Sequence, residues 1–162
     1  MEGYNALELL KIAKGVEEEG YRFYTEAAAR FDEEHIKKTF EYLAVEEAEH
    51  VLVFERLYQK VAESKKEQEV QLEDEAVTQY LKAISDTAIF NTNGLTNYKV
   101  SQVHTVKDAL LIGLQAEKDA ILFYETMLKN TSDPSLQKVL QRLIKEEVKH
   151  LYHFNMLIQE LG

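Results

Sequence analysis

Two Glu-x-x-His motifs lie 100 positions apart in this sequence, as Glu47 with His50 and Glu147 with His150. On a helix, residues three apart share one face, so both side chains of each motif can reach the same ion. Carboxylate and imidazole groups are ligands for iron and manganese as well as for other divalent metals. The motifs therefore predict metal binding, provided that the helices carrying them face each other.

Both motifs lie within apolar stripes whose members recur every three or four residues, as in the seam of a helical bundle. Two further seam positions are acidic, Glu17 and Glu117. Buried carboxylates are costly unless they are paired or bind a metal, and no Lys or Arg occupies these stripes. Two divalent cations would balance four glutamates. The predicted ligands of a dinuclear site are Glu17, Glu47, His50, Glu117, Glu147 and His150.

The elements that must position these ligands are four long helices. We expect them over residues 6–30, from 32 to about 62, from 105 to about 129, and from 134 to about 161. The start signals are Asn5 with Glu8, Asp32, Thr105 with Asp108, and Asp133 before Pro134. Short links make helices one and two, and helices three and four, antiparallel hairpins.

The hairpins are joined by about forty residues between Glu63 and His104. A shorter helix is predicted from Glu73 to Ile89, ended by residues 91–94. Its loose apolar stripe consists of Leu72, Ala76, Leu81, Ile84 and Ala88. The fold class is all-α, a four-helix bundle with one long crossover between helices two and three that contains the short extra helix. Residues 1–162 are expected to form one domain.

The two hairpins form an internal repeat, since each seam position of the first has a counterpart 100 positions later. Glu17 matches Glu117, and Tyr24 matches Tyr124. A long crossover makes helices one and three antiparallel, and likewise two and four. The resulting pseudo-twofold axis would bring both lone glutamates and both Glu-x-x-His pairs to one level of the bundle.

The overall composition excludes several classes of function. A formal net charge of −10 argues against binding to nucleic acid or an anionic membrane surface, and no apolar run approaches a membrane span. Without Cys, the chain has no disulfide, thiolate zinc site or iron–sulfur cluster. Zero Cys and an N-terminus without a secretion signal favour a cytoplasmic protein.

The motifs resemble those of the rubrerythrin-like branch of the ferritin-like superfamily. The similarity covers Val16 to Tyr24, Leu43 to His50, Ala116 to Tyr124 and Glu146 to His150. The resemblance implies a ferritin-like fold and two iron ions bound by the six predicted ligands, with manganese or mixed metals as alternatives. It also implies an oxidoreductase that reacts with hydrogen peroxide or dioxygen, which favours a role in oxidative stress.

Two departures from the family pattern bear on function. Rubrerythrins usually have a further Glu where this chain has Ala120, so the ligand set is closer to a bacterioferritin ferroxidase centre. These 162 residues contain no counterpart of the Cys-rich rubredoxin-like domain of rubrerythrins, so we expect a separate, rubredoxin-like donor protein to supply electrons. The alternatives are a ferroxidase or iron-handling protein, and a metal-binding bundle without catalysis. We expect a homodimer.

Other polar residues near the seam have several possible roles. Tyr24 and Tyr124 either pack in the core with a satisfied hydroxyl, or have a sharper role, which is a hydrogen bond to a ligand carboxylate or a part in redox chemistry. His153 lies off the seam, and His35 and His104 flank helix starts, so all three are expected outside the site. Neighbouring acids face away by helical rotation, either solvated or behind the ligands: Glu18, Glu19, Glu46, Glu49 and Glu146.

Overall fold

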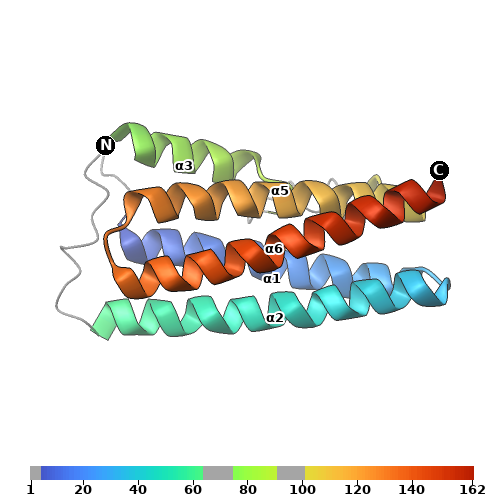
Figure 1. Ribbon diagram of the computed structural model, residues 1–162, viewed down its shortest axis with the longest axis horizontal. Coiled ribbons are helices and arrows are strands. Elements are labelled where there is room, and N and C mark those ends of the chain that lie inside the picture. The colour runs from blue at the N-terminus through green and yellow to red at the C-terminus, as the bar shows by residue number, and fades with distance from the viewer. Residues whose placement is uncertain (1–4, 64–74, 91–100) are drawn as a thin grey trace.

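Long helices dominate the computed structural model, which describes residues 5–63, 75–90 and 101–162. The bundle consists of α1 (Ala6–Arg30), α2 (Glu34–Glu63), α5 (Val106–Asn130) and α6 (Pro134–Leu161). A shorter helix, α3 (Glu75–Thr87), lies on the outside of the bundle against α5 (Figure 1). The four predicted long helices and the extra helix of the crossover are confirmed. The predicted end signal at 91–94 and the stripe residue Leu72 lie outside the described residues.

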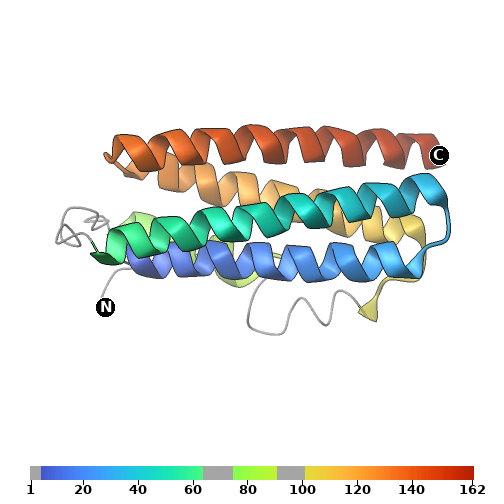
Figure 2. The same ribbon diagram turned by 90° about the horizontal axis from the view of Figure 1, so that it is seen from below.

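The two hairpins pack with the predicted directions. Figures 1 and 2 show α1 running antiparallel to both α2 and α5, and α6 antiparallel to both α5 and α2. The chain leaves α2 at one end of the bundle and enters α5 at the other, and α3 runs along the outside between these ends (Figure 1). This topology places the two halves of the repeat around a common central axis, as expected for two similar hairpins joined by a long crossover.

Capping side chains fix three of the four long helices at their starts. Asn5 with Glu8, and Thr105 with Asp108, form reciprocal capping boxes, while Asp133 accepts hydrogen bonds from the N–H groups of the first turn of α6. The start of α2 differs from the prediction. The Glu33 carbonyl accepts the first bond of this helix, from Lys37 N–H, so Glu33 and not Asp32 holds the N-cap position.

Two apolar clusters form the core on either side of the central polar layer. One contains Tyr24 and Phe154, and the other contains Phe54 and Tyr124, all of them essentially without exposed surface. Each cluster mixes residues from both hairpins. The polar layer is therefore sealed along the bundle axis by aromatic and aliphatic side chains, which keep bulk water out and lower the local dielectric.

The crossover closes one side of the bundle. Leu81, Ile84 and Ala88 are buried as predicted, whereas Ala76 is exposed. Beyond α3, the Ile89 N–H donates to Asp119 Oδ2 of α5 at 2.9 Å. Phe90 then packs into the core, with its ring centroid 5.2 Å from that of Phe23. This segment is thus held against α1 and α5 by both a hydrogen bond and aromatic packing.

Two helical glycines provide a matched test of this packing. A Cβ added at Gly113 would lie 2.6 Å from Cε1 of the fully buried Phe154, whereas a Cβ at Gly20 would meet only ordinary contacts at 3.5 Å or more. We predict that Gly113→Ala destabilises the fold by about 1–2 kcal/mol, because overpacking outweighs the gain in helix propensity. Gly20→Ala should stabilise it by up to about 1 kcal/mol.

Chemical denaturation of both variants checks this pair of predictions. Equal effects of the two substitutions would contradict the packing described for the Phe154 ring.

Candidate metal centre

All six predicted ligands converge in the polar layer at the middle of the bundle. Glu17 comes from α1, Glu47 and His50 from α2, Glu117 from α5, and Glu147 and His150 from α6. None is more than 4% exposed. The helix directions explain the convergence, since antiparallel pairing of α1 with α5 and of α2 with α6 brings equivalent positions of the repeat to one level.

The ligand atoms form two groups within which each residue's atom lies within 4.8 Å of the others. The first is Glu17, Glu47, His50 and Glu147, and the second is Glu47, Glu117, Glu147 and His150. Glu47 and Glu147 belong to both groups, so each can offer one oxygen to either of two ions. Each group adds one terminal carboxylate and one imidazole. This arrangement fits a dinuclear metal site in which Glu47 and Glu147 would lie within reach of both ions.

Both histidines direct the Nδ1 atom of the imidazole ring toward the carboxylates. His50 Nδ1 lies 2.9 Å from Glu147 Oε1 and 3.5 Å from Glu17 Oε2. His150 Nδ1 lies 3.2 Å from Glu147 Oε2 and 3.6 Å from Glu117 Oε1. The two rings are nearly parallel, with centroids 6.2 Å apart. Nδ1 is therefore the nitrogen that each histidine offers to an ion.

Unsatisfied buried atoms support the fit of a metal. Within the described residues, four buried side-chain polar atoms lack a hydrogen-bond partner, and three of them are Glu47 Oε2, His50 Nδ1 and Glu147 Oε1. His50 Nδ1 and Glu147 Oε1 are close, but not in hydrogen-bond geometry. Orphaned polar atoms are costly in a core. Because these three belong to the shared ligand set, bound cations would satisfy them.

Burial and repulsion shape the electrostatics of the unbound cluster. Burial, followed by the charges of Glu17 and Glu147, raises the pKa of Glu47 well above its usual range. Burial and the charge of Glu147 likewise raise the pKa of Glu117 well above its usual range. Burial opposes protonation of His150, but the facing carboxylates outweigh it and raise its pKa to about 10. Protons thus neutralise part of the charge that metal ions would neutralise.

The two tyrosines cross-link the halves of the repeat at this site. Tyr24 Oη donates a hydrogen bond to Glu117 Oε1 at 2.9 Å, and Tyr124 Oη donates one to Glu17 Oε1. Both therefore contact a predicted ligand, in addition to packing in the core. Burial and the facing carboxylates raise both tyrosine pKa values, so each hydroxyl keeps its proton at neutral pH. A redox role for them stays a prediction.

Outer carboxylates contact the far nitrogens of the histidines. His50 Nε2 lies 2.8 Å from Glu146 Oε2, and His150 Nε2 lies 3.8 Å from Glu46 Oε2. Each contact joins α2 to α6, so a histidine of one repeat pairs with an acid of the other. A carboxylate at this position fixes the tautomer and orientation of a ligating imidazole. Helical rotation correctly placed these acids off the seam but did not reveal these contacts.

A pocket reaches the cluster from the α1 and α5 side. Small or apolar residues form its walls beside three of the acids, and its lining is Val16, Glu17, Gly20, Tyr24, Glu47, Phe90, Ala116, Glu117 and Ala120. Gly20 and Ala120 leave space there, since neither side chain extends beyond a methyl group. Phe90 was not predicted there, because nothing local in the sequence links the crossover to this side of the bundle.

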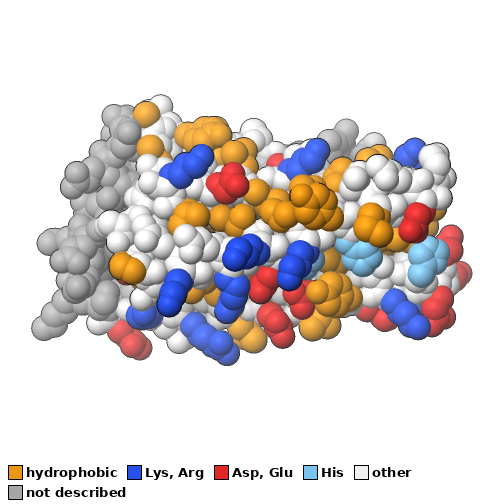
Figure 3. Space-filling model, viewed as in Figure 1, with side chains coloured by type: hydrophobic (Ala, Val, Ile, Leu, Met, Phe, Trp, Pro, Cys, Tyr) orange, Lys and Arg blue, Asp and Glu red, His pale blue; other side chains and the backbone are white. Residues whose placement is uncertain are grey.

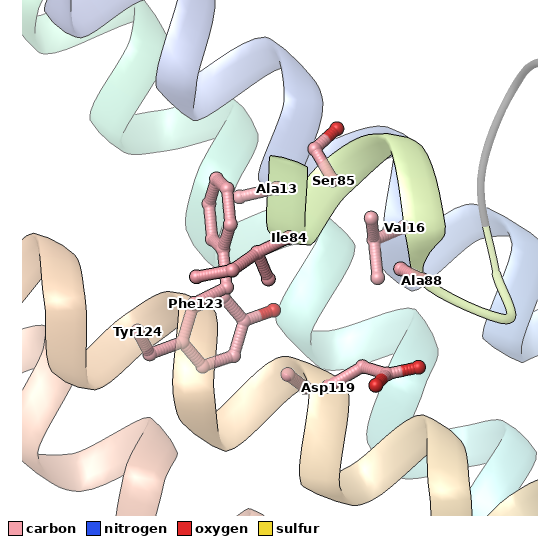
Figure 4. A pocket seen from close by; sticks show the side chains of 9 residues that line it. Ala13, Val16, Ile84, Ser85, Ala88, Asp119, Phe123 and Tyr124 are labelled. Carbon is pink, nitrogen blue, oxygen red and sulfur yellow. The ribbon is translucent and has the colours of Figure 1, made fainter. Parts of the chain in front are cut away.

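A second, apolar pocket lies alongside, beneath α3. Figure 4 shows it between Ala13 and Val16 of α1, Ile84, Ser85 and Ala88 of the crossover, and Asp119, Phe123 and Tyr124 of α5. It shares Val16 and Ala120 with the pocket beside the acids. The remaining histidines do not join the site: His35 and His104 are exposed and His153 is half-buried, and no ligand group among the described residues includes them.

The bundle with its cluster of four glutamates and two histidines defines a ferritin-like protein of the di-metal carboxylate class. The family model for rubrerythrin matches residues 8–158, and the chain belongs to the rubrerythrin family. The fold is similar to the crystal structure of a ferritin-like diiron-carboxylate protein from Thermotoga maritima. That match has a TM-score of 0.72 and 24% identity over 100% of this chain and 99% of that one. A search of curated proteins found no match.

The described helices also bear on the membrane prediction. None of the helices in the parts of the chain that the structure describes is long and apolar enough to cross a membrane.

The contact between His50 and Glu146 gives a first prediction about the site. Replacing Glu146 with Ala should lower the affinity for the metals about tenfold or more, because the imidazole loses the acceptor that orients it. Glu49→Ala, next to His50 in sequence but exposed, is the matched control and should leave the affinity unchanged. Competitive titration with a chromogenic chelator measures both, and equal affinities for the two variants would contradict the assigned role.

Metal binding should also release protons. At neutral pH the raised pKa values of Glu47, Glu117 and His150 leave protons on the metal-free cluster, and cations must displace them. The apparent metal affinity should therefore rise as pH increases through the neutral range. Calorimetric titrations in two buffers with different ionisation enthalpies measure the released protons. Binding enthalpies that do not depend on the buffer would contradict this prediction.

Proposed function

We propose that this protein is a di-iron oxidoreductase that reacts with hydrogen peroxide or dioxygen and receives electrons from a separate donor protein. The observation that carries the proposal is the sharing of Glu47 and Glu147 by two ligand groups, each completed by its own Glu and His. Carboxylates are hard anionic ligands that stabilise the ferric state, and imidazole suits iron as well. Manganese could use the same ligands, so iron is part of the proposal.

The chemistry needs two electrons for each peroxide. Reduction of hydrogen peroxide to two water molecules consumes two electrons and two protons. Two bound ferrous ions would supply one electron each and be restored afterwards by the donor. Among the side chains described at the site, only the two tyrosines could donate electrons to the peroxide without the ferrous ions, and their redox role is a prediction.

The residues around the site control geometry, water and protons. The four glutamates hold the charge of two cations, and the apolar clusters above and below exclude bulk water. Tyr24 and Tyr124 orient the terminal carboxylates through their hydroxyl groups. Since burial keeps these hydroxyls protonated, each terminal carboxylate retains a neutral hydrogen-bond donor throughout the neutral pH range.

The pocket on the α1 and α5 side favours a small oxidant. Val16, Gly20, Ala116 and Ala120 line it with little polar surface beyond the acids themselves, and Phe90 closes part of it. A larger organic substrate would need Phe90 and the Ile89–Asp119 hydrogen bond to yield. Dioxygen and hydrogen peroxide are much smaller, so they would demand less movement of these contacts.

Anaerobic loading followed by mixing with oxidant tests the proposal. The ferrous-loaded protein should develop the absorption of an oxidised di-iron centre on mixing with stoichiometric peroxide or dioxygen. Glu47→Ala should abolish this change because it removes a ligand common to both ions, while Glu49→Ala should leave it intact. Absence of oxidation by either reagent in the loaded wild-type protein would overturn the proposal.

A variant of the pocket separates access from metal binding. Ala120→Leu should slow oxidation about tenfold or more without lowering iron stoichiometry, because it fills space beside the acids rather than removing a ligand. Ala120→Ser is the conservative control and should react like the wild type. Stopped-flow absorbance and iron analysis measure the two quantities, and unchanged kinetics in Ala120→Leu would show that the oxidant does not enter here.

The ferroxidase alternative makes a different prediction for turnover. An iron-handling protein would oxidise many added ferrous ions per subunit and retain the product without any donor. The proposed oxidoreductase should stop after one oxidation of its bound pair until electrons are supplied. Counting the ferrous ions oxidised per subunit distinguishes them, and sustained oxidation with iron retention would favour iron handling.

A further inference from the structure

Six exposed Lys and Arg side chains lie on α6 and on the neighbouring part of α2, although the protein as a whole is strongly acidic. On α6 the basic residues recur at spacings of four and three, so they share one helix face: Lys138, Arg142, Lys145 and Lys149. Arg56 and Lys60 lie on α2, and all six residues are exposed. Figure 3 shows Lys and Arg side chains gathered on this side of the molecule, with Asp and Glu side chains beside some of them. We call these six residues the basic face.

The basic face lies over the histidine side of the metal centre. Arg142 Nε is 3.7 Å from Glu146 Oε1, and Glu146 Oε2 in turn is 2.8 Å from His50 Nε2. The side chain of Glu146 is 30% exposed, whereas that of His50 is 2% exposed. A single carboxylate therefore separates a ligand of the buried centre from the solvent at the basic face.

The internal repeat shows that this face is a departure from symmetry. Position 138 is basic in both halves, as Lys38 and Lys138, but the counterparts of the basic positions 142, 145 and 149 are Tyr42, Val45 and Glu49. Arg56 and Lys60 likewise correspond to Met156 and Glu160. The contact of the second histidine with its outer acid is also longer, 3.8 Å between His150 Nε2 and Glu46 Oε2. The two imidazoles are therefore not equivalent toward the surface.

We propose that the basic face is the docking surface for an acidic one-electron carrier protein, and that electrons enter the metal centre through Glu146 and His50. This inference rests on the proposed function. Charge complementarity selects the partner, because a net charge of −10 repels an acidic protein from the molecule as a whole and the basic face attracts it. Each docking passes one electron from the reduced carrier to the oxidised metal pair, so two dockings restore it.

The basic face and the oxidant pocket lie largely on different helices of the bundle. Apart from the ligand Glu47 of α2, the pocket is lined by residues of α1 and α5 and by Phe90, whereas the basic face consists of exposed residues of α2 and α6. A carrier bound over α6 therefore leaves the pocket open. Oxidant and electrons reach the same ions from different sides, which avoids direct reaction of the reduced carrier with the oxidant in the pocket.

Matched charge reversals test the docking surface. Lys145→Glu with Lys149→Glu changes the basic face, and Lys11→Glu with Lys107→Glu changes net charge equally on exposed positions of α1 and α5. The first readout is binding of a labelled acidic rubredoxin to protein loaded with redox-inactive zinc, followed by fluorescence anisotropy. The basic-face pair should weaken binding about tenfold or more, and the control pair about twofold or less.

The second readout is the rate at which reduced rubredoxin reduces the oxidised di-iron protein. That rate should fall with added salt and fall about tenfold further in the basic-face pair, while reduced methyl viologen, a small cation, should reduce every variant without such a loss. Equal losses in both pairs would overturn the proposal, because net charge alone would then explain them. An absence of salt dependence would overturn it as well.

Other occupants of the face give different outcomes. Tighter binding of a labelled DNA duplex than of rubredoxin would overturn the proposal in favour of nucleic acid. A change of oligomeric state in the basic-face pair alone, seen by size-exclusion chromatography, would overturn it in favour of a contact between copies of this chain. Failure of the proposed function is separate from these outcomes, because it appears as a lack of oxidation in the loaded wild type before any carrier is added.

Discussion

Negative charge buried at the centre of an apolar bundle is the constraint on which the rest of the structure depends. Four glutamates with at most 4% of their surface exposed cannot stay ionised together without counter-charges. Tyrosine hydroxyls and protonated histidines compensate part of this charge, and three orphaned atoms remain, Glu47 Oε2, His50 Nδ1 and Glu147 Oε1. Cations that bind there would contribute to folding as well as to chemistry, since they neutralise groups that otherwise repel one another.

The internal repeat explains how the folding chain assembles such a cluster. Each hairpin supplies one half of the ligands, and the polar contacts then cross between halves, with Tyr24 on Glu117, Tyr124 on Glu17, and His50 on Glu146. Neither hairpin alone supplies all of these contacts. Docking of the hairpins and formation of the site are therefore one event, and a metal that binds across the halves stabilises their association.

The sequence was sufficient to predict the fold class and the six converging residues, because helical period, capping signals and the 100-residue repeat are local or nearly local patterns. The structure corrected the start of α2 and revealed three features that depend on how helices rotate against each other. Glu146 reaches His50, Tyr124 reaches Glu17, and Phe90 enters the pocket wall. Such contacts join residues remote in the chain, and no spacing rule within one helix encodes them.

Several departures from the repeat lie at the border of the site and make the two halves of the chain different there. On the pocket side, Gly20 of the first half corresponds to Ala120 of the second half. Phe90 also lines this pocket, and it belongs to the crossover, which has no counterpart in the repeat. On the other side, Arg142, Lys145 and Lys149 of α6 correspond to Tyr42, Val45 and Glu49 of α2 in the repeat. A duplicated bundle would give two equivalent ions. Asymmetric walls would make two bound ions different toward both the pocket and the solvent, so that under the proposed function one ion could accept electrons at the surface while the pocket serves the pair.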